Sequence, residues 1–260
     1  MLAALALLLA AAAPSAAQAD SAAADRLRAD VEFLASDLLE GRDTGSRGYD
    51  IAAAYVASQY RAIGLKPGGP GGSWFLQVPL RRAFHAGPAQ ASIVAGRDTI
   101  ALGPADFVAR PSLTRQVRTI DAPLVFVGHG ISDPVLGIDD YAGLDLRGKI
   151  AVAIEGAPPG LPNEIAAHLD SAKEATAAAK GAAGLIEIAQ TGRRPGVHRF
   201  HLYGQPLIDW AEPSGKAAGQ TSRPELAGAI SRKVAEKLFA AAGKDLRGIC
   251  LLYTSDAADE

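Results

Sequence analysis

Residues 31–80 constrain the fold of this 260-residue chain more than any other stretch. They read VEFLASDLLEGRDTGSRGYDIAAAYVASQYRAIGLKPGG, then a short Pro/Gly turn, and then WFLQVPL. The apolar residues ahead of the loop recur on one face of a 3.6-residue period: Leu27, Val31, Leu34 and Leu38. This spacing predicts a helix over residues 21–39, and a similar pattern predicts a second helix over residues 50–63. Three glycines make residues 41–48 a loop between the two helices.

The rest of the chain alternates short β-prone runs with turns and further helices. Strands are expected at residues 74–80, 91–100, 124–127, 149–154, 185–188 and 225–231. Helices are expected at residues 163–180, which end at Gly181, and at residues 232–242, which end at Gly243. The fold class predicted from this order is α/β.

Composition narrows the class of protein. The chain is 48% hydrophobic and 21% charged, which is ordinary for a folded globular protein and argues against disorder. The formal net charge of −2 predicts no nucleic-acid partner and no strong attraction to an acidic membrane. Cys250 is the single cysteine, so an intrachain disulfide and a cysteine-based zinc finger are both excluded.

The N-terminal residues carry the pattern of an export signal. An apolar run of about a dozen residues ends in Ala17-Gln18-Ala19, which fits a cleavage site of small residues. The run is too short to span a bilayer, and no cysteine follows it to carry a lipid anchor. Residues 1–19 are therefore expected to be a signal peptide, with a frayed Ala-rich terminus as the alternative. We expect a periplasmic or secreted protein without a membrane anchor.

The block LEGRDTGSRGYDIAAAYVASQYRAIGLKPGG followed by WFLQVPL resembles the start of the zinc-dependent aminopeptidase family. This family includes aminopeptidase Y, glutamate carboxypeptidase and the transferrin receptor. Two later stretches, LDLRGKI at residues 144–150 and AAKGAAGLIEI at residues 178–188, resemble the protease-associated (PA) domain often inserted in these enzymes. The resemblance implies that residues 20–110 form the incomplete N-terminal segment of an α/β peptidase domain. It implies that residues 111–247 form a mostly β PA domain with flanking helices.

Three glycines of the second block are predicted to shape the scaffold. Gly148 permits a tight turn before a buried strand. Gly181 can take the left-handed conformation that ends a helix, and Gly184 can let that helix end lie close to the sheet. Neither a Walker motif nor a dinucleotide-binding motif is present in the sequence, so these glycines are not expected to bind phosphate.

The last residues have a different texture from the rest. The sequence CLLYTSDAADE fits neither a helix nor a strand and resembles the translation of an adapter used in DNA library preparation. Residues 248–260 are therefore expected to be a non-native tail on a truncated reading frame. The alternative is a genuine polar tail.

The resemblance implies a specific chemistry for the intact parent. Such enzymes hydrolyse an N-terminal peptide bond with two zinc ions, held by an H-x-D motif at a strand end, a Glu-Glu pair, an acidic residue and a later histidine. Here His168-Leu169-Asp170 matches H-x-D, but it lies in a predicted helix, and no Glu-Glu pair occurs in the sequence. We interpret His168 as a solvent-facing helix residue. His198 and His201 follow in a basic stretch that is expected to be a loop.

Other reactive residues give no catalytic pattern. His85 and His129 stand alone, and His129 between two glycines predicts a loop position. Asp43 and Asp50 could shape the first loop or the rim of the parent active site, although a solvated loop is the simpler interpretation. No G-x-S-x-G motif occurs, and Cys250 has no credible catalytic partner. No catalytic, cofactor-binding or metal-binding residue is therefore assigned.

The predicted function is that of an N-terminal fragment of an exported zinc-dependent aminopeptidase. Two zinc ions and peptide substrates are expected for the intact parent, and neither zinc binding nor hydrolysis is expected of this chain. The alternative is a non-catalytic PA-domain binding protein of the transferrin-receptor type. A two-domain periplasmic binding protein is a third possibility, but two helices and a few strands would form a poor closed core.

Overall fold

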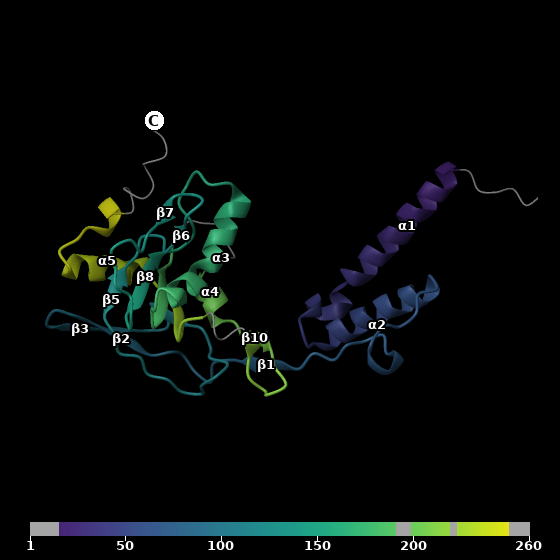
Figure 1. Cartoon of the computed structure of the whole chain (residues 1–260), viewed down its shortest axis with the longest axis horizontal. Coiled ribbons are helices and arrows are strands. Elements are labelled where there is room, and N and C mark those ends of the chain that lie inside the picture. Colours follow the sequence, from purple (N-terminus) through teal and green to yellow (C-terminus); the bar gives the residue numbers. More distant parts are fainter. Residues whose placement is uncertain (1–15, 191–198, 219–222, 250–260) are drawn as a thin grey trace, which may run out of the picture. The chain divides into compact units, whose positions relative to one another are not determined.

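The computed structural model describes residues 16–190, 199–218 and 223–249 (Figure 1). The chain divides into two compact units, Met1–Gln77 and Val78–Glu260. This division lies earlier than the boundary at residues 110 and 111 expected from the sequence. The reason is that strand β4 (Phe107–Ala109) pairs with β11 (Leu226–Ile230), so the residues before Arg110 join the second unit. None of the helices in the described residues is both long enough and apolar enough to cross a membrane.

The first unit is helical in its described residues, 16–77. It contains α1 (Ala16–Leu34), η1 (Asp37–Arg42), α2 (Arg47–Ala62) and η2 (Pro70–Gly72). The sequence predicted that the first helix would end at residue 39, but α1 ends earlier, at Leu34. The cause is Ser36, whose hydroxyl accepts a hydrogen bond from the Leu38 amide at 3.2 Å and starts the separate turn η1.

Helices α1 and α2 are joined by one aromatic and one polar contact. The Tyr55 hydroxyl on α2 donates a hydrogen bond to Asp30 Oδ1 on α1 at 2.5 Å. The rings of Phe33 and Tyr55 pack with their centroids 4.5 Å apart. The two amphipathic helices expected from the sequence are therefore present and in contact with each other.

The second unit is built on a mixed five-stranded sheet with the order β4-β11-β9-β8-β5. Four strands run parallel, and β4 is antiparallel to its neighbour β11. The parallel strands are β5 (Leu124–Phe126), β8 (Ile150–Ile154), β9 (Gly184–Ile188) and β11. Helix α3 (Asn163–Ala179) connects β8 to β9, which is the usual way to join adjacent parallel strands.

Both faces of the central strands are covered, as a parallel sheet requires. Alternate side chains point to opposite faces. Val152 and Ile186 pack in one apolar cluster with α5 (Arg232–Ala241), whereas Ala151 and Leu185 pack in another with Ala177 of α3. Every residue of β8 and β9 is consequently buried. This explains why KIAVAI and GLIEI read as nearly continuous apolar runs.

Short strand pairs and one short helix surround this sheet. They are the hairpin β2 (Ala91–Ala95) with β3 (Asp98–Leu102), the hairpin β6 (Ser132–Asp133) with β7 (Ile138–Asp139), the pair β1 (Leu80–Ala83) with β10 (Leu207–Trp210), and α4 (Arg199–Gly204).

Two strand predictions need correction. Residues 91–100 form the hairpin β2–β3 rather than one strand, because Gly96 turns the chain with a φ of +67°. Residues 74–79 are not a strand, and β1 begins only at Leu80, because its partner β10 lies opposite residues 80–83.

The predicted glycine roles hold at two of three positions. Gly148 has a φ of +70° immediately before β8, and Gly181 has a φ of +83° just after α3, both in the left-handed region. Gly184 instead begins β9. A Cβ there would lie 2.9 Å from Leu226 Cβ. This glycine therefore allows β9 and β11 to lie close together, and it is not the end of α3 that needs the space.

Candidate functional site

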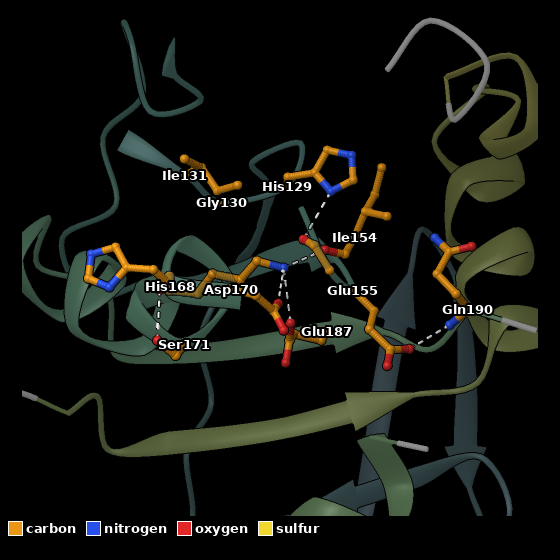
Figure 2. A network of polar contacts seen from close by, with 12 residues as sticks. His129, Gly130, Ile131, Ile154, Glu155, His168, Asp170, Ser171, Glu187 and Gln190 are labelled. Carbon is orange, nitrogen blue, oxygen red and sulfur yellow. Dashed lines mark hydrogen bonds and ion pairs between the residues drawn. The ribbon is translucent and has the colours of Figure 1, made fainter. Parts of the chain in front are cut away.

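The H-x-D sequence lies on helix α3, as the sequence predicted, and its two polar residues do different things. His168 is exposed, and its carbonyl accepts a hydrogen bond from the Ser171 hydroxyl at 2.7 Å. Asp170 points the other way and forms an ion pair with Lys173 Nζ at 3.0 Å (Figure 2). Both of these contacts therefore lie within α3, and Asp170 pairs with the lysine that connects this helix to the sheet.

Among the described residues of the second unit, four polar side chains form a group that we call the buried polar cluster: Asp170, Lys173, Glu187 and Tyr203. Lys173 comes from α3, Glu187 from β9 and Tyr203 from α4, and each of these three is only 1% exposed. The Lys173 amine donates to Glu187 Oε1 at 3.2 Å and to the Ile154 carbonyl at 2.8 Å. The Tyr203 hydroxyl donates to Glu187 Oε2 at 2.7 Å.

This arrangement satisfies each charge with an opposite charge or a hydrogen bond. A buried ion pair of this kind is costly to desolvate, and its loss is costly once one partner is removed. Lys173, Glu187 and Tyr203 are all shielded from solvent. The contacts of the buried polar cluster therefore fix α3, β9 and α4 to one another.

Arg110 extends the cluster toward the surface. Its guanidinium lies 4.8 Å from the centroid of the Tyr203 ring, within cation–π distance. The same guanidinium forms an ion pair with Glu174 of α3. The Arg110 amide also donates to the Ala227 carbonyl of β11 at 2.7 Å. One arginine thus links the end of β4 with α3, α4 and β11.

A second polar arrangement surrounds His129, which is 4% exposed. His129 Nδ1 lies 3.2 Å from the Gly156 carbonyl oxygen (Figure 2). Asp140 Oδ2 accepts a hydrogen bond from the Ile131 amide at 3.0 Å. Burial raises the pKa of the Asp140 carboxyl, and backbone amides of Ile131, His129 and Gly130 oppose that shift. The expected loop position of His129 is confirmed, and the contacts are those of a loop anchored to the protein.

The first glycine-rich loop is held by its own backbone and by short polar side chains. Ser46 Oγ accepts a hydrogen bond from the Tyr49 amide at 3.2 Å and caps α2, while Asp43 Oδ1 accepts one from the Thr44 amide. Glu40 and Arg42 have φ values of +51° and +56°, which non-glycine residues rarely adopt. Asp43 and Asp50 are exposed, as in the solvated-loop interpretation.

Of the remaining histidines, His85 is the one whose side chain the structure describes. His85 Nε2 lies 2.6 Å from the Ala109 carbonyl oxygen, far along the chain from His168. His198, the side chain of His201 and Cys250 lie outside the described residues, as do most of the expected signal peptide and tail. Within the part of the chain that the structure describes, no group of three or more His, Cys, Asp or Glu side chains could hold a metal ion. The described residues therefore do not fit the two-zinc site of the aminopeptidase family.

Sequence reasoning missed Lys173, Glu187 and Tyr203. Two of them could have been noticed. Lys173 lies in the apolar stripe Leu169–Lys173–Ala177 of α3, and Glu187 interrupts an apolar strand. A charge at a position that the period assigns to the core indicates a buried ion pair.

Comparison with known proteins gives structural neighbours only. No family model matches the sequence, and no curated protein matches it. Solved structures that resemble the chain include an aminopeptidase from Aneurinibacillus sp. strain AM-1, at 18% identity and a TM-score of 0.35. They also include BSAP, a zinc aminopeptidase from Bacillus subtilis, at 18% identity and a TM-score of 0.28. A third is a peptidase M28 precursor from Shewanella amazonensis SB2B, at 16% identity and a TM-score of 0.30.

These alignments cover most of this chain and less than half of each neighbour. They span 85%, 81% and 86% of the chain but 42%, 39% and 48% of the three solved proteins, in the same order. The structural neighbours named here are thus two aminopeptidases, one of them described as a zinc enzyme, and an M28 peptidase precursor, all at low identity. TM-scores below 0.5 carry no argument about function, so the proposal below depends on the motifs and on the geometry of this chain.

Proposed function

We propose that the chain is the N-terminal part of an exported zinc-dependent aminopeptidase, with a PA domain, whose zinc ligands belong to a part of the parent protein outside this sequence. The observation that carries the proposal is the order of two motif blocks along the chain. The first block folds into the end of the turn η1, a glycine-rich loop and helix α2, and its WFLQVPL end becomes a strand only from Leu80. In the second block, Gly148, β8, α3, Gly181 and β9 follow one another as the resemblance implies.

The surface of the first unit supports its assignment to a larger domain. Large apolar side chains on its helices and the turn after them remain exposed: Leu27 at 64%, Val31 at 56%, Leu38 at 82% and Ile63 at 72%. Leu27 and Val31 are four residues apart on α1 and so share one face of that helix. An exposed apolar helix face is often one that another protein element covers. Two helices with such a surface fit a domain whose sheet is supplied by residues outside the first unit.

The chain's own residues are proposed to act as scaffold, not as zinc ligands. Two zinc ions would supply an activated water and polarise the scissile carbonyl in the intact parent. In this chain, the carboxylates of Asp170 and Glu187 are already committed to Lys173. We assign no step of peptide hydrolysis to any residue of this sequence.

The test compares the purified chain with the protein encoded by the uninterrupted gene. Both are assayed with aminoacyl-anilides after treatment with a chelator and again after addition of zinc. The proposal expects zinc-restored hydrolysis by the complete protein and none by the chain. A complete protein that stays inactive, and whose downstream sequence lacks the H-x-D and Glu-Glu motifs, would instead support the non-catalytic binding role.

A further inference from the structure

A large cleft of the second unit lies on the face of the sheet that also carries α5. It has a volume of about 2540 Å³ and lies among the hairpin β2–β3, the irregular segment 110–123 and the strands β5, β8, β9 and β11. Small-molecule sites have volumes of roughly 300–1,000 Å³. The cleft is therefore large enough for a segment of polypeptide chain.

Apolar side chains form much of the cleft wall. Val152, Ile186 and Phe239 contribute from the buried cluster of the sheet and α5. Other apolar residues line the same cleft while remaining exposed: Phe84 at 72%, Val94 at 73%, Val117 at 86% and Leu124 at 37%. Exposed side chains of this size around an apolar wall are typical of a surface that binds a partner.

The charged residues of the cleft are almost all basic. Six cations line it, namely Arg81, Arg82, Arg110, Arg115, Arg118 and Lys244, and the single carboxylate among its lining residues is Asp121. This contrasts with the whole chain, whose formal net charge is −2. A cleft lined by one sign of charge attracts a partner of the opposite sign.

The electrostatic surroundings of the Arg118 guanidinium favour an acidic partner. Burial lowers the pKa of the Arg118 guanidinium, Glu225 opposes the shift, and the neighbouring Arg115 adds to it. The Arg115 guanidinium pairs with Glu225 at 3.7 Å, with both side chains more than half exposed. A further carboxylate in the cleft would act in the same direction as Glu225 and favour the charged form of Arg118.

We propose that this cleft binds an extended, acidic peptide segment that carries apolar side chains. The apolar walls hold the apolar side chains, and exposed cations of the rim such as Arg115 pair with the carboxylates, whereas Arg110 keeps its ion pair with Glu174. The apolar walls favour a peptide over a nucleic acid, since the phosphate backbone of a nucleic acid would leave them uncovered. The site is independent of zinc and of peptide hydrolysis, so the inference goes beyond the proposed function.

The experiment uses the purified full chain and a fluorescein-labelled peptide that alternates leucine with glutamate. Binding is followed by fluorescence anisotropy at low and high salt. Two matched peptides carry lysine in place of glutamate, or serine in place of leucine. Saturable binding of the leucine–glutamate peptide, weakened by salt and by either replacement, is the expected result.

Two variants connect binding to the cleft. Arg115→Glu reverses a rim charge, and Val117→Asp places a charge among the exposed apolar side chains. Each is expected to weaken binding by about tenfold, whereas Arg147→Glu, at an exposed cation outside the cleft, is expected to change it by less than about twofold. Circular dichroism on thermal unfolding checks that all three variants fold like the original chain.

Three results would overturn the proposal. The first is no saturable binding of the leucine–glutamate peptide at low salt. The second is binding that Arg115→Glu and Val117→Asp leave unchanged in folded protein. The third is displacement of the peptide by a single-stranded oligonucleotide with higher affinity, which would assign the basic residues to phosphate binding.

Discussion

Lys173 Nζ lies 3.2 Å from Glu187 Oε1, and both side chains are 1% exposed. This ion pair joins the helix between β8 and β9 to the second of those strands, so the crossover connection is fixed by charge as well as by apolar packing. The Ile154 carbonyl at the end of β8 accepts a hydrogen bond from the same amine. One lysine thus contacts all three elements of the β8–α3–β9 unit.

Lys173→Met should destabilise the second unit by about 3–5 kcal/mol, because Glu187 would remain buried without its counter-charge. Urea unfolding followed by circular dichroism measures this change. The double variant Lys173→Met with Glu187→Leu should recover part of the loss, since no unpaired charge then remains. Lys180→Met, at an exposed pair with Asp139, serves as the control and should cost less than about 1 kcal/mol. Equal losses for Lys173→Met and Lys180→Met would contradict the prediction.

Tyr203→Phe should cost about 1.5–3 kcal/mol, because the hydroxyl donates to a buried carboxylate at 2.7 Å. The ring and its contact with Arg110 remain in the variant. Tyr141→Phe is the matched control, since its hydroxyl donates to the neutral Gly130 carbonyl at 3.3 Å and should cost about 0.5–1.5 kcal/mol. Urea unfolding of both variants gives the comparison, and a larger loss for Tyr141→Phe would be inconsistent with the role assigned to Glu187.

Gly48→Ala should destabilise the first unit, because the added Cβ would lie 1.8 Å from the Leu39 carbonyl oxygen. Either α2 or η1 must then move. Gly68→Ala is the control, since no atom lies within 4 Å of its added Cβ. Hydrogen exchange of the α2 amides measures the effect, and faster exchange is expected for Gly48→Ala alone. Similar protection in the two variants would show that the helix does not depend on this close approach.

Asp140→Asn should remove a pH dependence of stability. The pKa of Asp140 is raised in the folded protein, so the native state binds more protons than the unfolded state between the ordinary aspartate pKa of about 3.9 and the raised value. The contribution of this group to stability is therefore full below about pH 3.9 and falls as the pH rises through the folded pKa.

Urea unfolding of the original chain and of Asp140→Asn across this acidic range tests the sign. The free energy of unfolding of the original chain, minus that of the variant, should decrease as the pH rises and then become constant. A difference that increases with pH would show that the carboxylate form is the one that the folded protein favours.

Local patterns predicted the elements whose stability comes from near neighbours. Helix α3 and strands β8 and β9 were expected within about two residues of their bounds, because glycines mark their ends and the two strands are apolar on both faces. Strand β1 was misplaced because its register is set by β10, more than a hundred residues later. Non-local pairing of this kind leaves little trace in the local sequence.

The candidate sites likewise include features that local sequence patterns predicted and features that depend on residues far apart in the chain. The helical position of His168 followed from the period of residues 163–180. The pairing of Glu187 with Lys173 and Tyr203 requires three separate elements to meet, and the basic cleft gathers cations from β1, the segment 110–123 and the turn after α5. Neither arrangement follows from the spacing of any one motif, since the residues come together only after the sheet has formed.

Under the proposed function, this chain carries part of the scaffold of a zinc aminopeptidase, and the zinc ligands belong to the rest of the parent protein. The most direct measurement is the zinc content per molecule of the purified chain and of the protein from the uninterrupted gene, each loaded with zinc and dialysed. The account predicts no stoichiometric zinc in the chain and two ions in the complete protein. Two tightly held zinc ions in the chain itself, with hydrolysis of aminoacyl-anilides, would contradict it.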